Sequence, residues 1–245
     1  MTRKGAGGRR PRTGSPRPAA AGRSRAGVGS QGKRSAAPSR AARPAPPEQP
    51  RTFRLGAVPG AMPGRWIDTW KRRMPHVALE LVEVPVAAQR DAVLSGRVDI
   101  ALVREPLERT GLHAIPLYEE LPVVVASADS HLLAADELTA DDLRGEVLLT
   151  TREDVLGPLD LPTADAASGP LDTVADAVAT VAAGVGIAVM PMSLARLHHR
   201  KDVDHRVLVD GPVAPVLLAW RQDATTPDVE TFVGIVRGRT ENSSR

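Results

Sequence analysis

Apolar residues after position 52 first follow two alternating patterns. Short apolar runs at 53–58, 77–82 and 98–103 predict three strands. Between these runs, apolar residues recur at helical spacing over 62–74 and 86–95, which predicts two amphipathic helices. Short connections and the right-handed crossover rule place this strand–helix–strand–helix–strand order in a parallel sheet. The pattern therefore predicts an α/β fold.

The stretch 174–191 combines a helix and a strand. Apolar residues recur at helical spacing up to Val181, and Gly184 follows where the helix would end, because glycine tolerates the left-handed cap conformation. The apolar run 187–190 then stops at Pro191. Such a run predicts a strand buried on both faces, as in a parallel sheet covered by helices.

The rest of the pattern predicts shorter elements. Residues 152–168 contain glycine and proline breaks and little periodicity, so we expect a loop there. Residues 228–236 are amphipathic and predict a last helix. The remaining predicted elements are strands at 112–117, 121–126, 146–150, 207–209 and 213–220, and helical turns at 139–143 and 193–197.

Charge divides the chain into two unlike parts. Residues 1–54 carry 14 Lys and Arg against one acid, whereas the other 191 residues carry 18 bases and 28 acids. The net charges are +13 and −10, so the overall +3 hides a basic tail and an acidic body. The tail has no Leu or Ile. Because such a segment cannot bury enough apolar surface to offset its ordering entropy, we predict that residues 1–51 are disordered.

Several classes of protein find no support in this sequence. No apolar h-region follows the basic start, so a secretory signal peptide is not expected. The chain has no run of about 18 apolar residues and no cysteine, so we expect no membrane span, disulfide or thiolate metal site. The simplest expectation is a cytoplasmic protein without a membrane partner. Its body is long enough for one core or two small lobes.

Six stretches of the body stand in an order that resembles a known family. They are FRLGAVPGAMP (53–63), RMPHVALELVE (73–83), LSGRVDIALVRE (94–105), LHAIPLYEELPVVVASADSHLL (112–133), LTADDLRGEVLL (138–149) and VATVAAGVGIAVMPMSLARL (178–197). Together they resemble the effector-binding (substrate-binding) domain of LysR-type transcriptional regulators. The resemblance covers about residues 52–240. It implies the type 2 periplasmic-binding-protein fold, an α/β fold of two Rossmann-like lobes.

The resemblance also implies a division of the body into lobes. The implied bounds are 52–121 and 214–240 for lobe 1, 122–213 for lobe 2, and a disordered end at 241–245. Two crossover strands, near 121–125 and 213–219, would form the hinge. A ligand would lie in the cleft between the lobes, where helix N-termini present free N–H groups.

The sequence departs from the family pattern in two places. A LysR regulator normally starts with a winged helix-turn-helix whose recognition helix enters the major groove of DNA, and residues 1–50 contain no segment suited to that role. The family also has a full helix after the strand predicted at 146–150, where this chain has the broken stretch 152–168. We therefore expect an effector-binding domain without its own helix-turn-helix and with a trimmed lobe 2.

The resemblance places the ligand cleft at the first two helix starts and at the ends of two strands. Family members often have Ser or Thr at these helix starts to hold a carboxylate, but this chain has Ala61, Met62 and Val86. Without those hydroxyls we expect a small effector that is weakly polar or mono-anionic. The candidate ligand-binding residues are Gly60, Ala61, Met62, Val86, Ala87, Arg104, Thr150 and Thr151.

The polar candidates have ordinary structural alternatives. Arg104 suits a bidentate pair with an acidic ligand, but a salt bridge to Glu105 or Glu108 explains it equally well. Thr150 and Thr151 would either contact the ligand or only complete a strand.

Other motifs give no support for catalysis, a metal or a cofactor. His198, His199 and His205 have no Glu or Cys at metal-ligand spacing, so we expect surface histidines. The pair Gly184 and Gly186 lacks the third glycine of a dinucleotide fingerprint and precedes a strand. No G-x-S-x-G motif or nucleophile–base arrangement is present, so we expect no enzyme.

The basic tail is a candidate for nucleic-acid contact. Arg9, Arg10 and Arg12 faintly resemble minor-groove-binding arginine hooks, but the usual Arg-Gly-Arg-Pro core is missing. Aromatic stacking partners are absent, which argues against single-strand recognition. A net charge of +13 allows sequence-independent phosphate contact. The alternatives are a solubilising tail without function and an upstream start codon assigned in error.

These features fit functions of different classes. The first is a LysR-type effector-binding domain that senses a small molecule in transcription regulation, and that dimerises as family domains do; Trp66 and Trp70 would then be core or dimer contacts. The second is a solute-binding protein of a transport system, which shares the fold but needs an export signal or lipid anchor. An enzyme on this fold would need catalytic groups in the cleft. A non-specific nucleic-acid-associated protein, acting through the tail, is a further alternative.

Overall fold

The computed structural model describes residues 51–238 of the chain. The predictions for the tail, for its three candidate arginines, for the absent helix-turn-helix and for the end at 241–245 lie outside the described residues. Arg51, which the sequence assigned to the tail, begins the first strand, where it pairs with Val77 of the second strand. Its side chain also forms a salt bridge of 2.7 Å with Asp228.

Lobe 1 is built on a five-stranded sheet with the order β2-β1-β3-β11-β4. The first three strands in the chain run parallel, as the sequence predicted, and β1 lies between β2 and β3. Strand β11 then pairs antiparallel with both β3 and β4. The strands are β1 (Arg51–Ala57), β2 (Val77–Glu83), β3 (Ile100–Arg104), β4 (Leu112–Glu120) and β11 (Ala214–Arg221).

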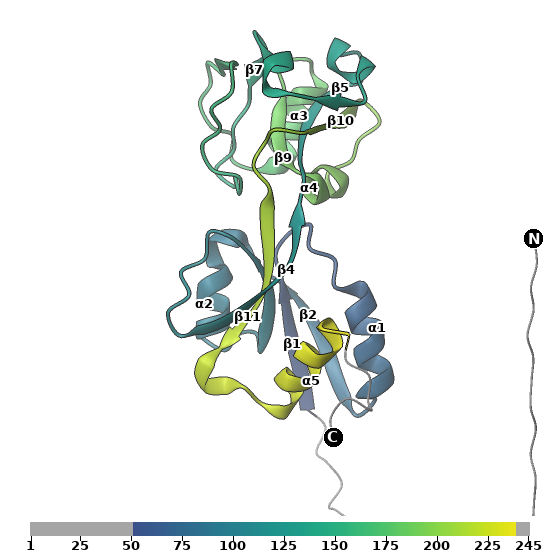
Figure 1. Ribbon diagram of the computed structural model, residues 1–245, viewed down its shortest axis with the longest axis vertical. Helices are drawn as coiled ribbons and strands as arrows, with labels where there is room; N and C mark the ends of the chain where they lie inside the picture. The colour runs from purple at the N-terminus through teal and green to yellow at the C-terminus, as the bar shows by residue number, and fades with distance from the viewer. Residues whose placement is uncertain (1–50, 239–245) are drawn as a thin grey trace, which may run out of the picture. The chain divides into compact units, whose positions relative to one another are not determined.

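Helices cover both faces of this sheet (Figure 1). Helices α1 (Gly64–Arg73) and α5 (Pro227–Val236) lie on one face, and α2 (Gln89–Leu94), preceded by the 3-10 turn η1 (Val86–Ala88), lies on the other. Trp70 stacks on Phe53 with ring centroids 4.4 Å apart, and both rings contact Phe232. Trp66 and Trp70 are therefore core residues of lobe 1.

Lobe 2 has a smaller sheet with the order β6-β10-β5-β9. Helix α3 (Val174–Ala182) packs its apolar face onto this sheet, together with α4 (Met192–Leu197). The strands are β5 (Pro122–Ser127), β6 (Glu137–Leu138), β9 (Ala188–Pro191) and β10 (Val203–Leu208). A separate parallel pair joins β7 (Val147–Leu148) and β8 (Ala164–Asp165), and 3-10 turns lie at η2 (His131–Ala134), η3 (Ala140–Leu143) and, in lobe 1, η4 (Gln222–Ala224).

The helix–glycine–strand unit has the predicted elements in an unpredicted pairing. Gly184 follows α3 with φ +75°, which confirms the predicted helix end. Strand β9, however, pairs antiparallel with β5, for example Met190 with Val123. Ile187, at the start of the same apolar run, forms a parallel bridge with Leu148, so the comparison with a parallel sheet was wrong on the β5 side only. An unbroken apolar run shows that both faces are buried, but burial of both faces does not determine strand direction.

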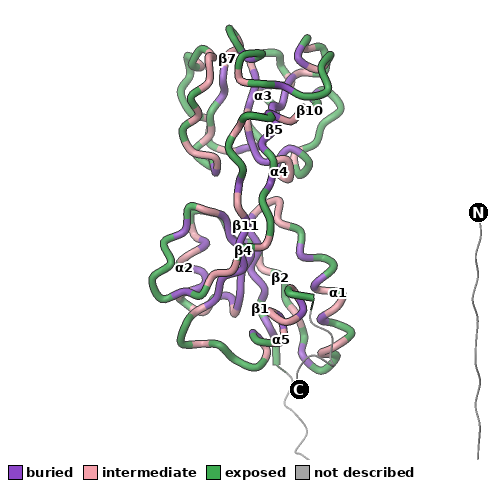
Figure 2. The backbone as a smooth tube through the Cα atoms, in the orientation of Figure 1, coloured by how far each residue is buried: buried purple, intermediate pink, exposed green. Residues whose placement is uncertain are grey.

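The lobes are joined by two crossovers (Figure 1). The chain leaves the first sheet at Glu120 and enters the second at Pro122, so Leu121 is the first crossover. It returns through residues 209–213, between β10 and β11. The crossovers thus meet the predicted hinge segments, 121–125 and 213–219, only at residues 121 and 213, and the other residues of these segments belong to β5 and β11. Figure 2 shows buried residues concentrated inside each lobe.

Residues 149–173 are irregular and contain only β8; this range includes the loop predicted at 152–168 and the last two residues of the strand predicted at 146–150. Backbone hydrogen bonds hold this segment in place of a helix. The amide of Arg152 donates to the carbonyl of Leu171 at 2.9 Å, and the amide of Leu171 donates to the carbonyl of Thr150 at 2.9 Å. The loop therefore lies against the start of α3, where it forms one wall of a cavity.

Candidate functional site

A cavity of about 510 Å³ lies between the two lobes, and we call it the inter-lobe cavity. Lobe 1 contributes the turn after β1, the end of β2, η1 and the end of β3. Lobe 2 contributes the irregular loop, the start of α3 and the end of α4. Its charged lining residues are Glu83, Arg104, Arg152, Glu153 and Asp154, joined by His198.

Three of the eight predicted site residues line this cavity. They are Val86, Ala87 and Arg104. Val86 also packs against the apolar core of lobe 2, although it belongs to η1 of lobe 1. Turn η1 of lobe 1 therefore contacts the second lobe directly at this edge of the cavity.

Arg104 is fully buried at the end of β3. Its Nη1 donates to Glu120 Oε2 at 2.6 Å, and its Nη2 donates to the carbonyl of Pro59 at 3.2 Å. The side chain of Gln89 bonds both backbone groups of Arg104, at 2.8 and 2.9 Å. The Nε of Arg104 has no hydrogen-bond partner among residues 51–238.

The proposed salt bridges of Arg104 to Glu105 or Glu108 were both wrong. Glu105 pairs with Arg109, and Glu108 pairs with Arg90, on the protein surface. Glu105, the next residue in the chain, points away from Arg104 because successive side chains of an extended chain face opposite sides of a sheet. The partner that the structure provides is 16 residues away in the sequence, at the end of β4.

A serine of lobe 2 completes the network around Arg104. Ser193, in α4, accepts a hydrogen bond from Arg104 Nη2 at 3.0 Å and donates one to Glu120 Oε2 at 2.8 Å. The network of Arg104, Glu120 and Ser193 therefore ties the two lobes together beside the crossover. We call it the junction network. Nothing in the local sequence of these residues predicts it, because they come from three distant segments.

The other lobe 1 candidates lie on a different cavity. Gly60, Ala61 and Met62 line a second cavity of about 790 Å³ with Tyr118, Glu120, Ser193 and Arg196. Gly60 closes the junction tightly: it has φ +82°, and a Cβ added there would lie 2.5 Å from Ser193 Oγ. Burial raises the pKa of Tyr118, and the charge of Glu120 acts in the same direction.

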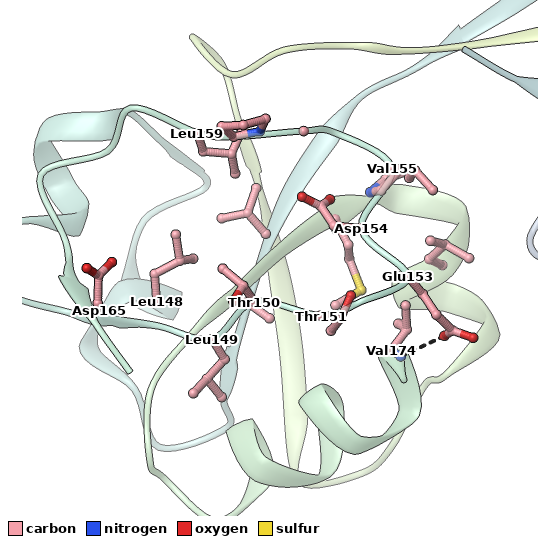
Figure 3. Close-up of a pocket in the computed structure, with 17 residues that line it drawn as sticks. Leu148, Leu149, Thr150, Thr151, Glu153, Asp154, Val155, Leu159, Asp165 and Val174 are labelled. Atoms are coloured by element: carbon pink, nitrogen blue, oxygen red, sulfur yellow. Dashed lines mark hydrogen bonds between the residues drawn. The ribbon is translucent and has the colours of Figure 1, made fainter. Parts of the chain in front are cut away.

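The two threonines line a third cavity, of about 220 Å³, within lobe 2 (Figure 3). The carbonyl of Thr150 accepts from Leu171, and Thr151 forms an isolated parallel bridge with the same residue. Their backbones thus complete the loop in front of α3. This cavity adjoins the inter-lobe cavity, since Glu153, Asp154 and Val155 line both, with further shared residues.

The start of α3 already carries a carboxylate. Glu153 Oε2 accepts a hydrogen bond from the backbone amide of Val174 at 3.0 Å (Figure 3). Thr173 caps the same helix by accepting from the amide of Asp176 at 3.1 Å. The resemblance had placed Thr150 and Thr151 at the cleft, but the sequence gave no sign that Glu153 would occupy a helix terminus, nor that Glu83 and His198 would line the cavity.

Two further features concern metals and membranes. Within residues 51–238, no group of three or more His, Asp and Glu side chains is arranged to hold a metal ion. Of the helices described in this range, none is long and apolar enough to cross a bilayer. His199 is exposed at the surface, and His198 and His205 are partly exposed.

Comparison with known proteins decides the family. The model of the LysR substrate binding domain matches residues 47–241, which is most of the chain. This chain belongs to the LysR substrate-binding domain family. The resemblance inferred from the sequence is thereby confirmed, and so is the two-lobed fold that it implied.

Relatives of this LysR domain include known regulators. The HTH-type transcriptional regulator AlsR of Bacillus subtilis (strain 168) is 28% identical over 180 residues, which cover 69% of this chain and 59% of AlsR. The HTH-type transcriptional regulator CatR of Pseudomonas putida is 28% identical over 180 residues, covering 69% of this chain and 62% of CatR. The chain thus spans about three fifths of the length of these two relatives.

Solved structures show the same fold as this LysR domain. The BenM effector binding domain with its effector benzoate superposes with a TM-score of 0.63 at 22% identity, covering 77% of this chain and 91% of that one. The reduced OxyR regulatory domain of Pseudomonas aeruginosa gives a TM-score of 0.59 at 21% identity, covering 77% of this chain and 95% of that one.

Proposed function

We propose that this LysR substrate-binding domain senses a small molecule in transcription regulation, in the cytoplasm, and binds its ligand without transforming it. The observation that carries the proposal is the inter-lobe cavity, whose volume of about 510 Å³ suits a small organic molecule. The relatives AlsR and CatR are named as transcriptional regulators, which supports the regulatory role.

The geometry indicates how ligand binding affects the arrangement of the two lobes. A ligand in the inter-lobe cavity contacts residues of both lobes, so it favours whichever lobe arrangement gives it more contacts. The junction network and the two crossovers link the lobes beside the cavity. Ligand contacts at Arg104 therefore bear on the same network that fixes the lobes relative to each other.

A cavity-filling substitution tests the proposal. Ala87 is exposed in the cavity wall, and Ala87→Trp fills the space that a ligand would use. Ala134→Trp, at an exposed position of lobe 2 away from the cavity, is the matched control. A panel of small organic molecules should raise the melting temperature of wild type and of Ala134→Trp but not of Ala87→Trp. Equal shifts in all three proteins would contradict binding in this cavity.

Two partners belong to the same proposal. A homodimer is supported by exposed apolar side chains around the second cavity, notably Met62, Leu121 and Leu197, and light scattering tests it. Electrostatic, sequence-independent DNA contact by the basic tail is supported by the 12 Lys and Arg residues and single acid of residues 1–50, a net charge of +11. Gel shifts with specific and scrambled duplexes should show weak, salt-sensitive binding that is lost when residues 1–50 are deleted.

A further inference from the structure

We propose that the inter-lobe cavity selects an uncharged or cationic ligand that carries a neutral oxygen acceptor, such as an amide or an amino alcohol, and discriminates against carboxylates. This inference rests on the proposed ligand-binding function and names the ligand class of the same site. Of the two classes that the sequence left open, weakly polar and mono-anionic, the charges in the cavity favour the first.

The charges of the cavity wall that have no oppositely charged partner in the described part of the chain belong to acidic side chains. Glu83, Glu153 and Asp154 line it, and all three are exposed to solvent there. Glu83 has no hydrogen-bond or ion-pair partner among residues 51–238. Asp154 accepts from the backbone amide of Leu156 at 2.9 Å, a contact that leaves its charge uncompensated. A carboxylate ligand would therefore meet like charges at short range.

Both arginines of the wall are neutralised by partners in the protein. Arg104 is paired with Glu120 at 2.6 Å, and both side chains are buried. Arg152 is paired with Asp172 at 3.0 Å. Neither guanidinium leaves an uncompensated positive charge for an anionic ligand, and the three lining acids keep the net charge of the wall negative.

The backbone anion site of the wall is also occupied. A helix N-terminus attracts anions through its free N–H groups. At the start of α3, one of these groups, the amide of Val174, already donates to Glu153 Oε2 at 3.0 Å (Figure 3). The protein thus supplies its own carboxylate at the place where an anionic ligand would otherwise bind.

One lining residue has a buried side-chain donor that lacks an acceptor in the part of the chain that the structure describes. Arg104 Nε is buried and unpaired among residues 51–238, and Arg104 lines the cavity. Buried donors without partners are rare because each costs the hydration that it loses. A neutral oxygen acceptor satisfies this donor without adding negative charge next to Glu120. An amine on the same ligand would be attracted by Glu83, Glu153 and Asp154.

Matched probes test the inference directly. Benzamide, benzylamine and benzoate share one ring, and hexanamide, hexylamine and hexanoate share one alkyl chain. Saturation-transfer NMR and titration measure the dissociation constant of each probe for the full chain. We expect the amide and amine of each set to bind with a dissociation constant about tenfold lower than the carboxylate. The signals should disappear in Ala87→Trp and persist in Ala134→Trp.

Charge-neutral variants sharpen the test. Glu153→Gln removes one charge but keeps an oxygen that accepts from Val174, so the helix start is preserved; Glu83→Gln removes a charge with no internal partner. Each variant should reduce the ratio between the dissociation constants of the carboxylate and the amine severalfold. Glu137→Gln, an exposed acid of β6 outside the cavity, is the matched control and should leave the ratio unchanged.

The outcomes separate this inference from the function on which it rests. Carboxylates that bind as well as or better than their amides and amines, with signals lost in Ala87→Trp, overturn the ligand class and leave the cavity as the binding site. Binding of no probe, or binding that Ala87→Trp does not affect, contradicts the proposed site itself and the inference with it.

Discussion

The two lobes share one architecture but are stabilised by different residues. All six aromatic residues, three Trp, two Phe and one Tyr, belong to lobe 1, and residues 122–213 contain none. Lobe 1 joins strands of five to nine residues around the Phe53–Trp70–Phe232 cluster. Lobe 2 includes three strands of two residues and a core of Val, Ala, Leu, Ile and Met.

The difference indicates which lobe is stabilised by a few large buried side chains and which lobe opens locally at lower cost. Each aromatic side chain buries a large area, so a few residues fix the packing of lobe 1. In lobe 2 the same task is divided among many small side chains, caps and loop hydrogen bonds. Segments with few buried contacts are where local opening is least costly. One wall of the inter-lobe cavity comes from such a segment, the loop before α3.

The largest expected effect tests the aromatic anchor. Trp70→Ala removes a fully buried ring and the hydrogen bond from its Nε1 to the carbonyl of Val77. It should lower the free energy of unfolding by about 3–5 kcal/mol, measured by urea denaturation. Ile187→Val, in the core of lobe 2, should cost only about 0.5–1.5 kcal/mol. Equal losses in the two variants would remove the proposed contrast between the lobes.

The next effect concerns the junction between the lobes. Glu120→Gln leaves the guanidinium of Arg104 buried without its charge partner, which should cost about 3 kcal/mol in the free energy of unfolding. Ser193→Ala keeps that pair and should cost about 1 kcal/mol. If Glu120→Gln unfolds no more easily than Ser193→Ala, the pair does not stabilise the junction.

A pair of glycine substitutions measures how tightly the lobes meet. Gly60→Ala combines the strain of φ +82° with a contact of 2.5 Å to Ser193 Oγ. Gly145→Ala has a similar φ of +86° but no atom within 4 Å of the added Cβ. Backbone strain should lower the free energy of unfolding of both variants by about 1 kcal/mol. The loss should be larger for Gly60→Ala because its Cβ also collides with Ser193. Equal melting temperatures would mean that Ser193 moves away freely.

The smallest effect is a pH dependence confined to lobe 2. Partial burial lowers the pKa of His205 below its ordinary value of 6.5; Arg196, Arg206 and His199 act in the same direction and Asp204 opposes them. The unfolded chain therefore binds a proton at His205 more readily than the folded chain does, so stability decreases as pH falls below 6.5 and through the lowered pKa of the folded state. Unfolding midpoints at about pH 8 and about pH 5 should differ less in His205→Gln than in wild type. His76→Gln, an exposed histidine of lobe 1, should leave the difference unchanged.

The sequence alone determined most elements of lobe 1 and the family, whereas in lobe 2 it missed β6 and β8 and located only the end of β10. Alternating apolar periods located β1, α1, β2, β3 and α5 to within a few residues, because each exposes one face or none and its burial follows the local pattern. Gly184 predicted the end of α3, since a positive φ is a local property. The order of six short stretches was enough to identify the LysR substrate-binding domain.

Only the tertiary structure decided pairing and the composition of the site. The direction of β9 depends on its neighbour β5, which an apolar run does not specify. The partner of Arg104 is Glu120, not a neighbour in the chain, and Ser193 reaches both from the other lobe. Contacts between distant segments form when whole lobes pack, so no local signal precedes them. For that reason the sequence predicted that Arg104 lies in the cleft, but it did not predict that Glu120 neutralises its charge. The net negative charge of the cavity wall became evident only from the fold.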